Sequence, residues 1–343
     1  MRAMNAKRWM AIMIAIGVMF FSIIIQLISG VQNIADTEVD GFASLFMDGG
    51  GIQTHTITPG SPGEQIVVLS VNGAIIDSGS TSLFDTQTFQ FRLFMEMLDI
   101  IENDDTIAGV VLYVNSPGGG VYESAQIRRR LDHIQSERGI PLYASFGSMA
   151  ASGGYYISSG ADQIFAPKET LTGSIGVIFS ALNVAGLFEE FGIEAMTVTS
   201  GEHKDILSPY REMTDVERDI LQSMVDNSYD GFVRVIAQGR GMSESHVRSF
   251  ADGRIVDGIQ AKELGLIDAH GYLEDAIAAL KADYDLGNAQ VIHFQAAPAF
   301  PLIFGMNLEG ILPSNPSSVD QIARALDTNT APRLMYILPS MVY

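Results

Sequence analysis

The chain has 343 residues, 47% of them hydrophobic and 17% charged, so it is long and apolar enough for one large folded domain or two ordinary ones. With 40 acidic and 20 basic side chains its formal net charge is −20, which argues against nucleic acid as a partner because phosphate binding needs a basic face. It contains no cysteine, so disulfides, thiol catalysis and cysteine-ligated metals are excluded.

The N-terminal segment predicts a membrane anchor. Residues 9–29 carry no charged side chain, and this length spans a bilayer as a helix. Residues 1–8 are basic and the first charges after the apolar run are acidic. We therefore expect residues 1–8 in the cytoplasm and the catalytic part of the chain outside the cell membrane. A cleaved signal peptide is the competing interpretation, although the run is long for one and lacks a clean cleavage site.

Residues 30–64, rich in Gly, Asp, Thr, Ser and Pro, are expected to form a linker that holds the next domain off the membrane. From 65 to 285 the chain alternates between strand and helix patterns. Strands are expected at 66–71, 107–114, 142–146, 163–166 and 194–199, and helices at 88–102, 121–137, 182–191, 215–238, 244–250, 260–264 and 273–282. This alternation indicates an α/β fold with a mainly parallel sheet flanked by helices.

Two glycine-rich loops follow buried strands and open helices. In the second, Ser152 precedes the helix start, where backbone N–H groups lack helical partners and can bind negative charge. Ser152 is therefore a candidate nucleophile with the Gly153 N–H as an oxyanion donor; the alternative is a small-residue packing site. The first loop, 115–120, should reach the same sheet edge, so the Gly119 N–H is the expected second donor.

A nucleophilic serine needs a base, and the candidates are few. Of the six histidines, only His203 follows an expected strand, and Lys204 lies next to it. A lysine acts as a base only when unprotonated, so a pKa of about 10.4 would have to fall by roughly three units in a closed cleft. Taken alone, such a lysine is more often a solvated surface residue.

Three motifs, in this order, resemble bacterial signal peptide peptidase A in its short form with one catalytic domain and an N-terminal anchor. They are Ala-Ala-Ser-Gly-Gly-Tyr-Tyr-Ile-Ser at 150–158, Leu-Thr-Gly-Ser-Ile-Gly-Val at 171–177 and Ser-Gly-x-x-Lys at 200–204; Asn-Ser-Pro-Gly-Gly at 115–119 fits as well. The resemblance covers about residues 65–285. It implies a fold similar to Clp protease and crotonase, a serine–lysine dyad and a ring-shaped homo-oligomer.

Residue by residue, the resemblance assigns Ser152 as nucleophile, Lys204 as general base and Ser174 as the hydroxyl that orients the lysine. The expected protein is a membrane-anchored serine endopeptidase that degrades remnant signal peptides and other short hydrophobic peptides, without metal or cofactor. Two alternatives remain open. One is an acyl-CoA hydratase-like enzyme that uses Glu123 or Glu137, and the other is a catalytically silent membrane scaffold.

The C-terminal extension, 286–343, ends in ten residues without side-chain charge, 334–343. Leaving such an apolar tail in water is costly, at about 25 cal/mol per Å² of apolar surface. We expect it to dock in extended form, either in the substrate groove as an added strand or as an edge strand in a subunit interface.

Overall fold

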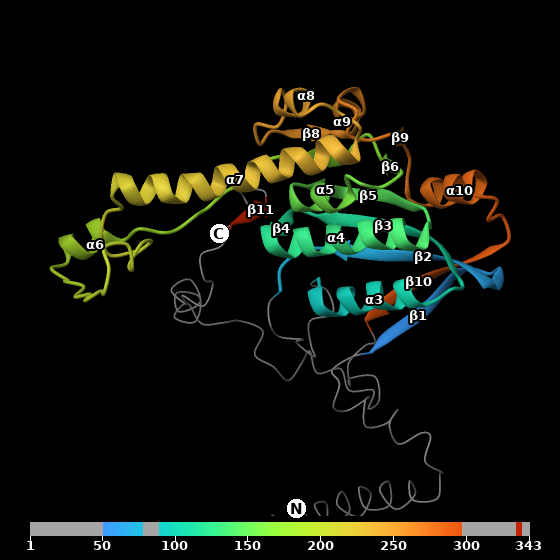
Figure 1. The fold of residues 1–343 in the computed structure, drawn as a ribbon, viewed down its shortest axis with the longest axis horizontal. Helices are drawn as coiled ribbons and strands as arrows, with labels where there is room; N and C mark the ends of the chain where they lie inside the picture. The colour runs from blue at the N-terminus through green and yellow to red at the C-terminus, as the bar shows by residue number, and fades with distance from the viewer. Residues whose placement is uncertain (1–50, 78–88, 297–333, 338–343) are drawn as a thin grey trace, which may run out of the picture. The chain divides into compact units, whose positions relative to one another are not determined.

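The computed structural model describes residues 51–77, 89–296 and 334–337 (Figure 1). Apart from Gly51, these residues fall in one structural unit, 52–343. The expected anchor at 9–29 lies outside the described residues. Within the described ranges no helix has both the length and the apolar character needed to cross a membrane.

The centre of the unit is a sheet in the strand order β1-β10-β2-β3-β5-β6-β9, with β7 paired to β5 and β8. The strands are β1 (Ile52–Thr58), β2 (Ser61–Asn72), β3 (Ile107–Ser116), β4 (Gly118–Gly120), β5 (Leu142–Ala151), β6 (Gln163–Ala166), β7 (Leu171–Gly173), β8 (Ile255–Asp257), β9 (Ala269–His270), β10 (Ala289–Ala296) and β11 (Met335–Ile337). Among the described strands of this sheet, only the β1–β10 and β7–β8 pairings are antiparallel. The expected mainly parallel α/β fold is confirmed.

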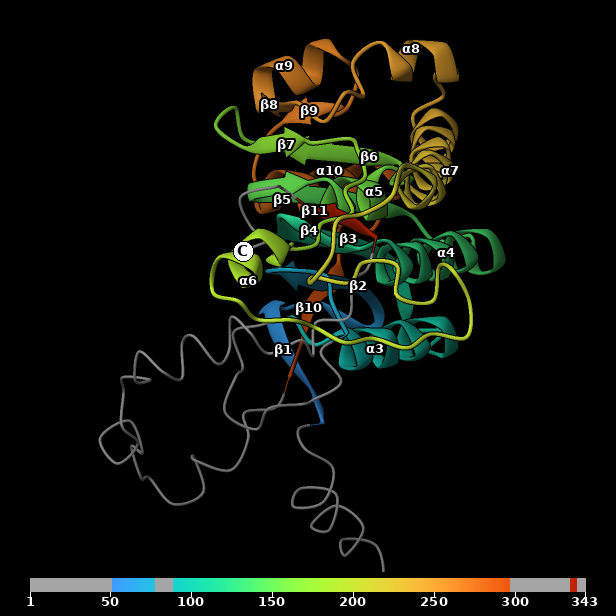
Figure 2. The same ribbon diagram turned by 90° about the vertical axis from the view of Figure 1, so that its left-hand side faces the viewer.

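Helices cover both faces of this sheet. They are α3 (Phe91–Asn103), α4 (Val121–Arg138), α5 (Gly153–Ser158), α6 (Ala185–Glu190), α7 (Asp215–Gly239), α8 (Glu244–Arg248), α9 (Gly258–Glu263) and α10 (Leu273–Asp283). Helices α3, α4 and α7 lie on the same side of the sheet (Figure 2), and α10 packs against the opposite face.

The alternation of side chains along β2 shows why both faces need a cover. Val67, Leu69 and Val71 point into a core shared with α3, α4, α5 and α7, whereas Ile66 and Val68 point into a second core with α10. Successive strand residues face opposite sides, and all five side chains are buried. A continuous apolar run is therefore what a two-sided parallel strand requires.

Two sequence-based boundaries were too narrow. Residues 52–64 were expected in the linker, but β1 and the first residues of β2, from Ser61 on, belong to the sheet. Beyond residue 285, β10 joins the sheet between β1 and β2. The exposed face of β1 is mainly polar and without apolar alternation, so its strand character depends on pairing with a segment more than 200 residues away.

The strand expected at 194–199 does not form, and those residues belong to no helix or strand. Met196 and Val198 are more than nine-tenths exposed. A β-prone sequence is not a strand without a neighbour to pair with. The helix expected at 182–191 shortens to α6.

The sheet core yields a stability prediction. Leu112, in β3, is fully buried, and Leu112→Ala should destabilise the protein by roughly 2–5 kcal/mol because it removes buried methyl groups and leaves a cavity. The matched control is Leu171→Ala, since Leu171 is 41% exposed and its loss should change stability by less than about 1 kcal/mol. Urea unfolding measures both; equal losses would contradict the assigned core.

Candidate active site

Ser152 lies at a strained turn between β5 and α5. Its φ is +53°, although it is not glycine, and such a conformation persists only where the surroundings impose it. Its N–H donates to the Gly173 carbonyl at 2.8 Å. The side chain is fully buried, and its Oγ has no hydrogen-bond partner among the described residues. A buried hydroxyl with no partner is costly unless a ligand or another group meets it.

Ser174 lies beside this turn because of strand register. Strands β5 and β7 are parallel, and Ala151 pairs with Gly173, so the two serines follow paired residues at the same ends of adjacent strands. Ser174 is 4% exposed and also has a positive φ, +50°; its N–H donates to the Arg254 carbonyl at 2.7 Å. The structure therefore brings Ser152 and Ser174 to one place, as expected.

Gly119 and Gly153 also come together. An atom placed as a Cβ on Gly153 would lie 3.0 Å from the Gly119 nitrogen and 2.7 Å from Ser124 Oγ. On Gly119 a Cβ would lie 2.1 Å from the Ile75 carbonyl oxygen. Neither position has room for a side chain, so the glycines are needed for close backbone approach. The two expected oxyanion donors are thus neighbours.

A segment of the C-terminal tail, β11, pairs with the strand that carries Gly119. The pairing with β4 is antiparallel, with Met335 opposite Gly120 and Tyr336 opposite Gly119. The Val121 N–H donates to the Leu334 carbonyl at 3.2 Å. Along an antiparallel ladder, hydrogen-bonded pairs alternate with pairs that are not hydrogen-bonded. Leu334 and Val121 form a hydrogen-bonded pair, so Tyr336 and Gly119, two residues further along each strand, form the next one.

The Tyr336 carbonyl oxygen reaches the two donor glycines. A Cβ placed on Gly118 would lie 2.0 Å from this oxygen and 2.7 Å from the Gly153 nitrogen, and one on Gly153 would lie 3.1 Å from the same oxygen. On its other edge Met335 exchanges hydrogen bonds with Ile178, at 3.0 and 3.1 Å. The tail is held from both sides as an extended peptide, which agrees with the expected strand addition.

The Tyr336 side chain is 2% exposed and fills an aromatic pocket. Its ring centroid lies 5.0 Å from that of Tyr156, stacked, and 4.5 Å from that of Phe232. Its hydroxyl donates to the Ser228 carbonyl at 3.0 Å. Sequence analysis did not identify this pocket, because Tyr156 in α5 and Phe232 in α7 are far apart in sequence and both are far from the tail.

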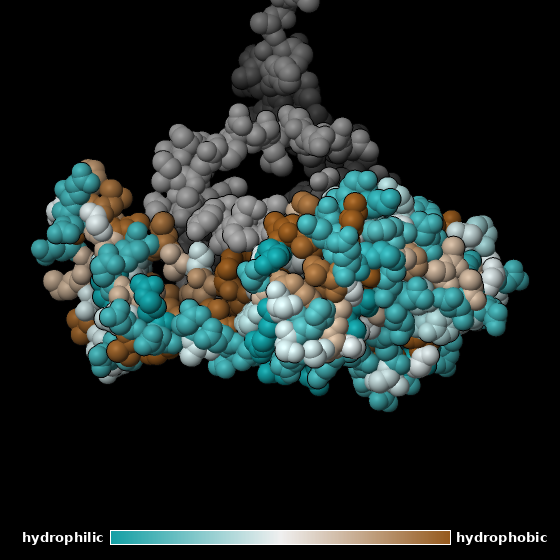
Figure 3. Space-filling view, turned by 90° about the horizontal axis from the view of Figure 1, so that it is seen from above, coloured by the Kyte–Doolittle hydropathy of each residue, from teal (hydrophilic) through white to brown (hydrophobic). Residues whose placement is uncertain are grey.

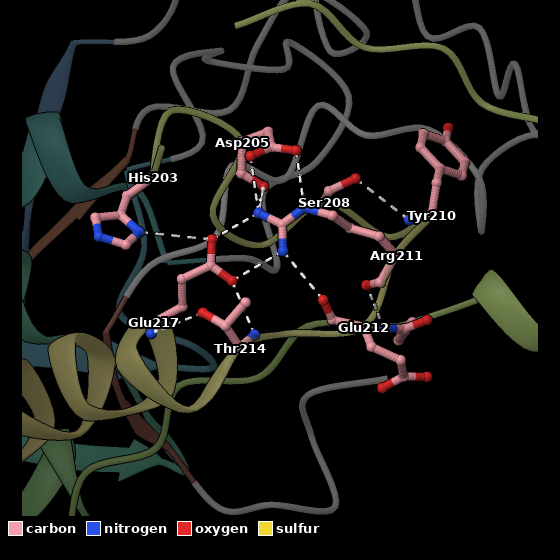
Figure 4. A network of polar contacts seen from close by, with 9 residues as sticks. His203, Asp205, Ser208, Tyr210, Arg211, Glu212, Thr214 and Glu217 are labelled. Carbon is pink, nitrogen blue, oxygen red and sulfur yellow. Dashed lines mark hydrogen bonds and ion pairs between the residues drawn. The ribbon is translucent and has the colours of Figure 1, made fainter. Parts of the chain in front are cut away.

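Lys204 does not meet Ser152 or Ser174 within the described part of this chain. It lies in a turn, residues 201–208, which we call the lysine turn; its side chain is exposed and has no hydrogen bond or ion pair to any described residue. Its neighbour Asp205 is instead bound by Arg211, which also binds Glu217 (Figure 4). The structure therefore leaves the serine side and the lysine side of the expected dyad separate within one chain.

The lysine turn belongs to a projecting region with little of its own core. Residues 182–224, which we call the arm, comprise α6, the lysine turn and the N-terminal part of α7, and extend away from the sheet (Figure 1). In α7 the buried residues are Phe232, Val233, Ile236 and Ala237 near its end, and Glu217 near its start. The large apolar side chains that the arm exposes are Leu182, Leu187, Phe191, Ile193, Met196, Val198, Tyr210, Val216, Ile220 and Met224.

Such exposure is unusual on a monomer, where large apolar patches mark interaction surfaces. In the space-filling view, apolar patches interrupt the polar surface at the end of the molecule that carries α6 (Figure 3). The arm is thus suited to burial against another protein surface.

The two glutamates of the hydratase alternative are not arranged as a pair. Glu123 is buried near the start of α4 and accepts a 3.4 Å hydrogen bond from the Asp77 N–H, while Glu137 is exposed near the end of the same helix. In the described ranges no three His, Asp or Glu side chains are grouped so that they could hold a metal ion.

Comparison with known proteins identifies the family. The family model described as Peptidase family S49 matches residues 134–287, and that described as Clp protease matches residues 82–169. A protein of Enterococcus faecium with the provisional name signal peptide peptidase SppA is 44% identical over 294 residues, 85% of this chain and 85% of that protein. The chain belongs to peptidase family S49.

As an S49 member it is a serine peptidase with the Clp protease-like fold, and the recognition made from the three motifs is confirmed. A provisionally named protease of Methanocaldococcus jannaschii is 36% identical, over 62% of this chain and 68% of that protein. Among solved structures, a variant of the 1510-N membrane-bound stomatin-specific protease aligns with a TM-score of 0.41 and 14% identity, over 64% of this chain and 84% of that one.

The seated tail gives the S49 peptidase a testable contact. Tyr336→Ala should empty the aromatic pocket and loosen β11, so the Val121 amide, which donates to Leu334, should exchange hydrogen faster by roughly tenfold or more. Tyr336→Phe keeps the ring and loses only the hydroxyl, so its exchange should stay close to wild type. Mass-spectrometric hydrogen exchange decides this, and unchanged protection in Tyr336→Ala would contradict the assigned anchor.

Proposed function

We propose that this serine peptidase uses Ser152 as nucleophile and Lys204 as general base to cleave short hydrophobic peptides, chiefly remnant signal peptides. The observation that carries the proposal is the position of the tail's own peptide bond. The Tyr336 carbonyl lies against Gly119 and Gly153, and Gly153 directly follows Ser152. A carbonyl held by two backbone donors beside a nucleophile is the arrangement that acyl transfer needs.

The reaction then proceeds in two steps, acylation of the serine and hydrolysis of the acyl-enzyme. Ser152 Oγ bonds to the carbonyl carbon as its proton passes to the neutral Lys204 amine, and the oxyanion is held by the Gly119 and Gly153 N–H groups. The C–N bond breaks, the lysine returns the proton to the leaving amine, and an acyl-enzyme remains. Water then attacks the ester carbonyl carbon and gives a proton to the lysine. The bond between this carbon and Ser152 Oγ breaks, the lysine returns the proton to Oγ, and the peptide leaves as a carboxylic acid.

The lysine is proposed to come from a second copy of the chain. Among the residues that the structure describes, Ser152 Oγ is buried without a partner and the Lys204 side chain is exposed without one, although the two members of a dyad must be within hydrogen-bond reach. The arm that carries Lys204 exposes apolar surface and would bury it against a neighbour. Head-to-tail contacts of this kind close into a ring, and Ser174, beside Ser152, would orient the incoming amine.

The tail also indicates the substrate class. A peptide bound as β11 is bound adds an antiparallel strand to β4, and its side chain at the Tyr336 position enters the pocket of Tyr156 and Phe232. We expect an aromatic or large apolar residue before the cleaved bond. Signal peptides carry apolar cores, and the Enterococcus faecium relative is named for them.

The site of action is proposed to be the outer side of the cell membrane. Residues 9–29 would anchor the chain, and the basic residues 1–8 would remain in the cytoplasm. Hydrophobic peptides left in or near the bilayer would then be within reach of the catalytic domain.

A mixing experiment tests both the dyad and its division between copies. Ser152→Ala and Lys204→Ala should each lower peptide cleavage by roughly 10³-fold or more, while His203→Ala keeps most activity. After subunit exchange, an equal mixture of the two inactive proteins should recover about one quarter of wild-type activity, because a quarter of randomly formed interfaces carry both residues. Near-normal activity of Lys204→Ala would overturn the dyad; an inactive mixture whose mixed rings are shown by two affinity tags would overturn its division.

A second prediction concerns the tail. Since Tyr336 lies at the position of the residue before a cleaved bond, the active enzyme should trim its own chain after Tyr336, whereas Ser152→Ala should keep Tyr343. Deleting 332–343 should raise cleavage of a short hydrophobic peptide and leave the oligomer intact. Intact mass, size-exclusion chromatography and a peptide assay measure these. Loss of the oligomer without a gain in specific activity would instead favour an interface role for the tail.

A further inference from the structure

The lysine turn is bound to α7 through one arginine. Arg211 donates to both carboxylate oxygens of Asp205, at 2.8 Å each, and to both of Glu217, at 2.8 and 2.6 Å (Figure 4). Its Nη2 also donates to the Asp205 carbonyl at 3.3 Å. Two bidentate pairs from one planar guanidinium fix distance and orientation together. Because Asp205 follows Lys204, this clamp determines where the lysine's backbone lies.

The far end of the clamp is built into the helix start. Glu217 is 1% exposed and forms a capping box with Thr214: the Glu217 N–H donates to Thr214 Oγ1 at 3.2 Å, and the Thr214 N–H donates to Glu217 Oε2 at 3.0 Å. His203 Nδ1 lies 3.9 Å from Glu217 Oε1. The turn itself is closed by Lys204 N–H to Gly201 O, at 3.1 Å. Lys204 is thus carried on a short turn tied to the first turn of α7.

The clamp also offsets one of the two carboxylate charges that lie close to the lysine turn. Hydrogen bonds from Arg211 lower the pKa of Asp205, and hydrogen bonds from Arg211 and then the Thr214 N–H lower the pKa of Glu217 to about 2. Both carboxylates therefore stay ionised throughout the neutral and alkaline range, where Arg211 remains their counter-charge. The ionisable groups of the turn, the 209–214 segment and the first turn of α7 are Glu202, His203, Asp205, Tyr210, Arg211, Glu212, Asp215, Glu217 and Arg218.

We propose that Arg211 is a positioning residue for the catalytic lysine, which it serves by holding the lysine turn on α7 and by keeping the Asp205 and Glu217 carboxylates from acting as counter-ions of the ammonium group. This rests on the proposed role of Lys204 as base. An unpaired carboxylate beside a lysine favours the charged amine, and a charged amine cannot take the serine proton. Without Arg211 the full charge of both carboxylates would face the turn, whereas with Arg211 one of the two negative charges is offset.

The pH dependence of the rate separates charge from shape. In the wild-type ring, the rate should rise with pH as the amine loses its proton. Arg211→Gln should move the midpoint of this rise upward by roughly 0.5–1 pH unit, because losing the guanidinium charge leaves two carboxylates that favour the protonated amine. Arg211→Lys keeps the charge but not the paired geometry, so it should lower the maximal rate by about tenfold or more with a smaller shift of the midpoint.

The double variant Asp205→Asn/Arg211→Gln is the decisive experiment, because it removes the arginine together with the carboxylate of the residue that follows Lys204. Its midpoint should return at least halfway to that of the wild type. The matched control is Arg218→Gln, in the same first turn of α7, whose exposed side chain makes no ion pair with a described residue; its profile should be unchanged. Size-exclusion chromatography checks that every variant keeps its oligomer.

Two results would overturn the proposal while leaving the dyad intact: an unchanged profile in Arg211→Gln, or a loss of rate with an unmoved midpoint that Asp205→Asn does not restore. The second would mean that Arg211 only supports the fold of the turn. Failure of the dyad is separate, since it appears as full activity in Lys204→Ala whatever the Arg211 variants do.

Discussion

The register between β5 and β7 is the constraint on which the site depends. Because the two strands are parallel and Ala151 pairs with Gly173, both end at the same edge and each delivers a serine there in a positive-φ conformation. The β3–β5 pairing, which ends with Ser116 opposite Ala150, brings the glycine strand β4 to the same edge. Buried apolar strands thus set the backbone positions, and the chemistry occupies the turns that follow them.

At that edge, small residues leave room for another backbone. The tail enters between β4 and Ile178 as an extended strand, and its tyrosine fills a pocket made by α5 and α7. Backbone hydrogen bonding would accept many sequences, whereas the aromatic pocket selects a side chain. The same groove can therefore serve a range of apolar peptides and, in their absence, the chain's own end, which would restrain activity through local concentration alone.

The proposed general base, Lys204, is carried on the arm, whose apolar side chains have no cover within the described chain. On the proposed division of the dyad, the lysine of one copy meets the serine of its neighbour, and assembly would be a condition of activity. Such an arrangement would keep single chains inactive until the ring forms. The Arg211 clamp fits this division, since an arm with little core of its own needs ion pairs to hold a precise turn.

Sequence patterns could predict what is local. The buried strands at 107–114 and 163–166 and the long helix at 215–238 were placed within one or two residues, because apolar periodicity reports burial directly. Loop composition at parallel strand ends also indicated that Gly119 and Gly153 would be neighbours, whereas the catalytic roles of Ser152 and of these two glycines stay predictions. The strand at 194–199 failed because β-propensity carries no information about pairing partners.

Other features could not be predicted from the sequence. The pocket of Tyr156 and Phe232 depends on contacts between segments that are distant in sequence. The clamp depends on which of several nearby carboxylates Arg211 binds. Only the Thr-x-x-Glu spacing at 214–217, a capping-box pattern, could have drawn attention to Glu217. The composition of the tail predicted docking in extended form, either in the substrate groove or in a subunit interface. The pairing of β11 with β4 and its register required the structure.

The central claim is that Ser152 is the activated nucleophile of this peptidase, and labelling with a serine-directed fluorophosphonate tests it most directly. Peptide mapping of the assembled wild-type protein should find the phosphonate on Ser152 alone, with labelling reduced by at least an order of magnitude in Lys204→Ala and absent in Ser152→Ala. Labelling of another serine, or equal labelling with and without Lys204, would contradict the account.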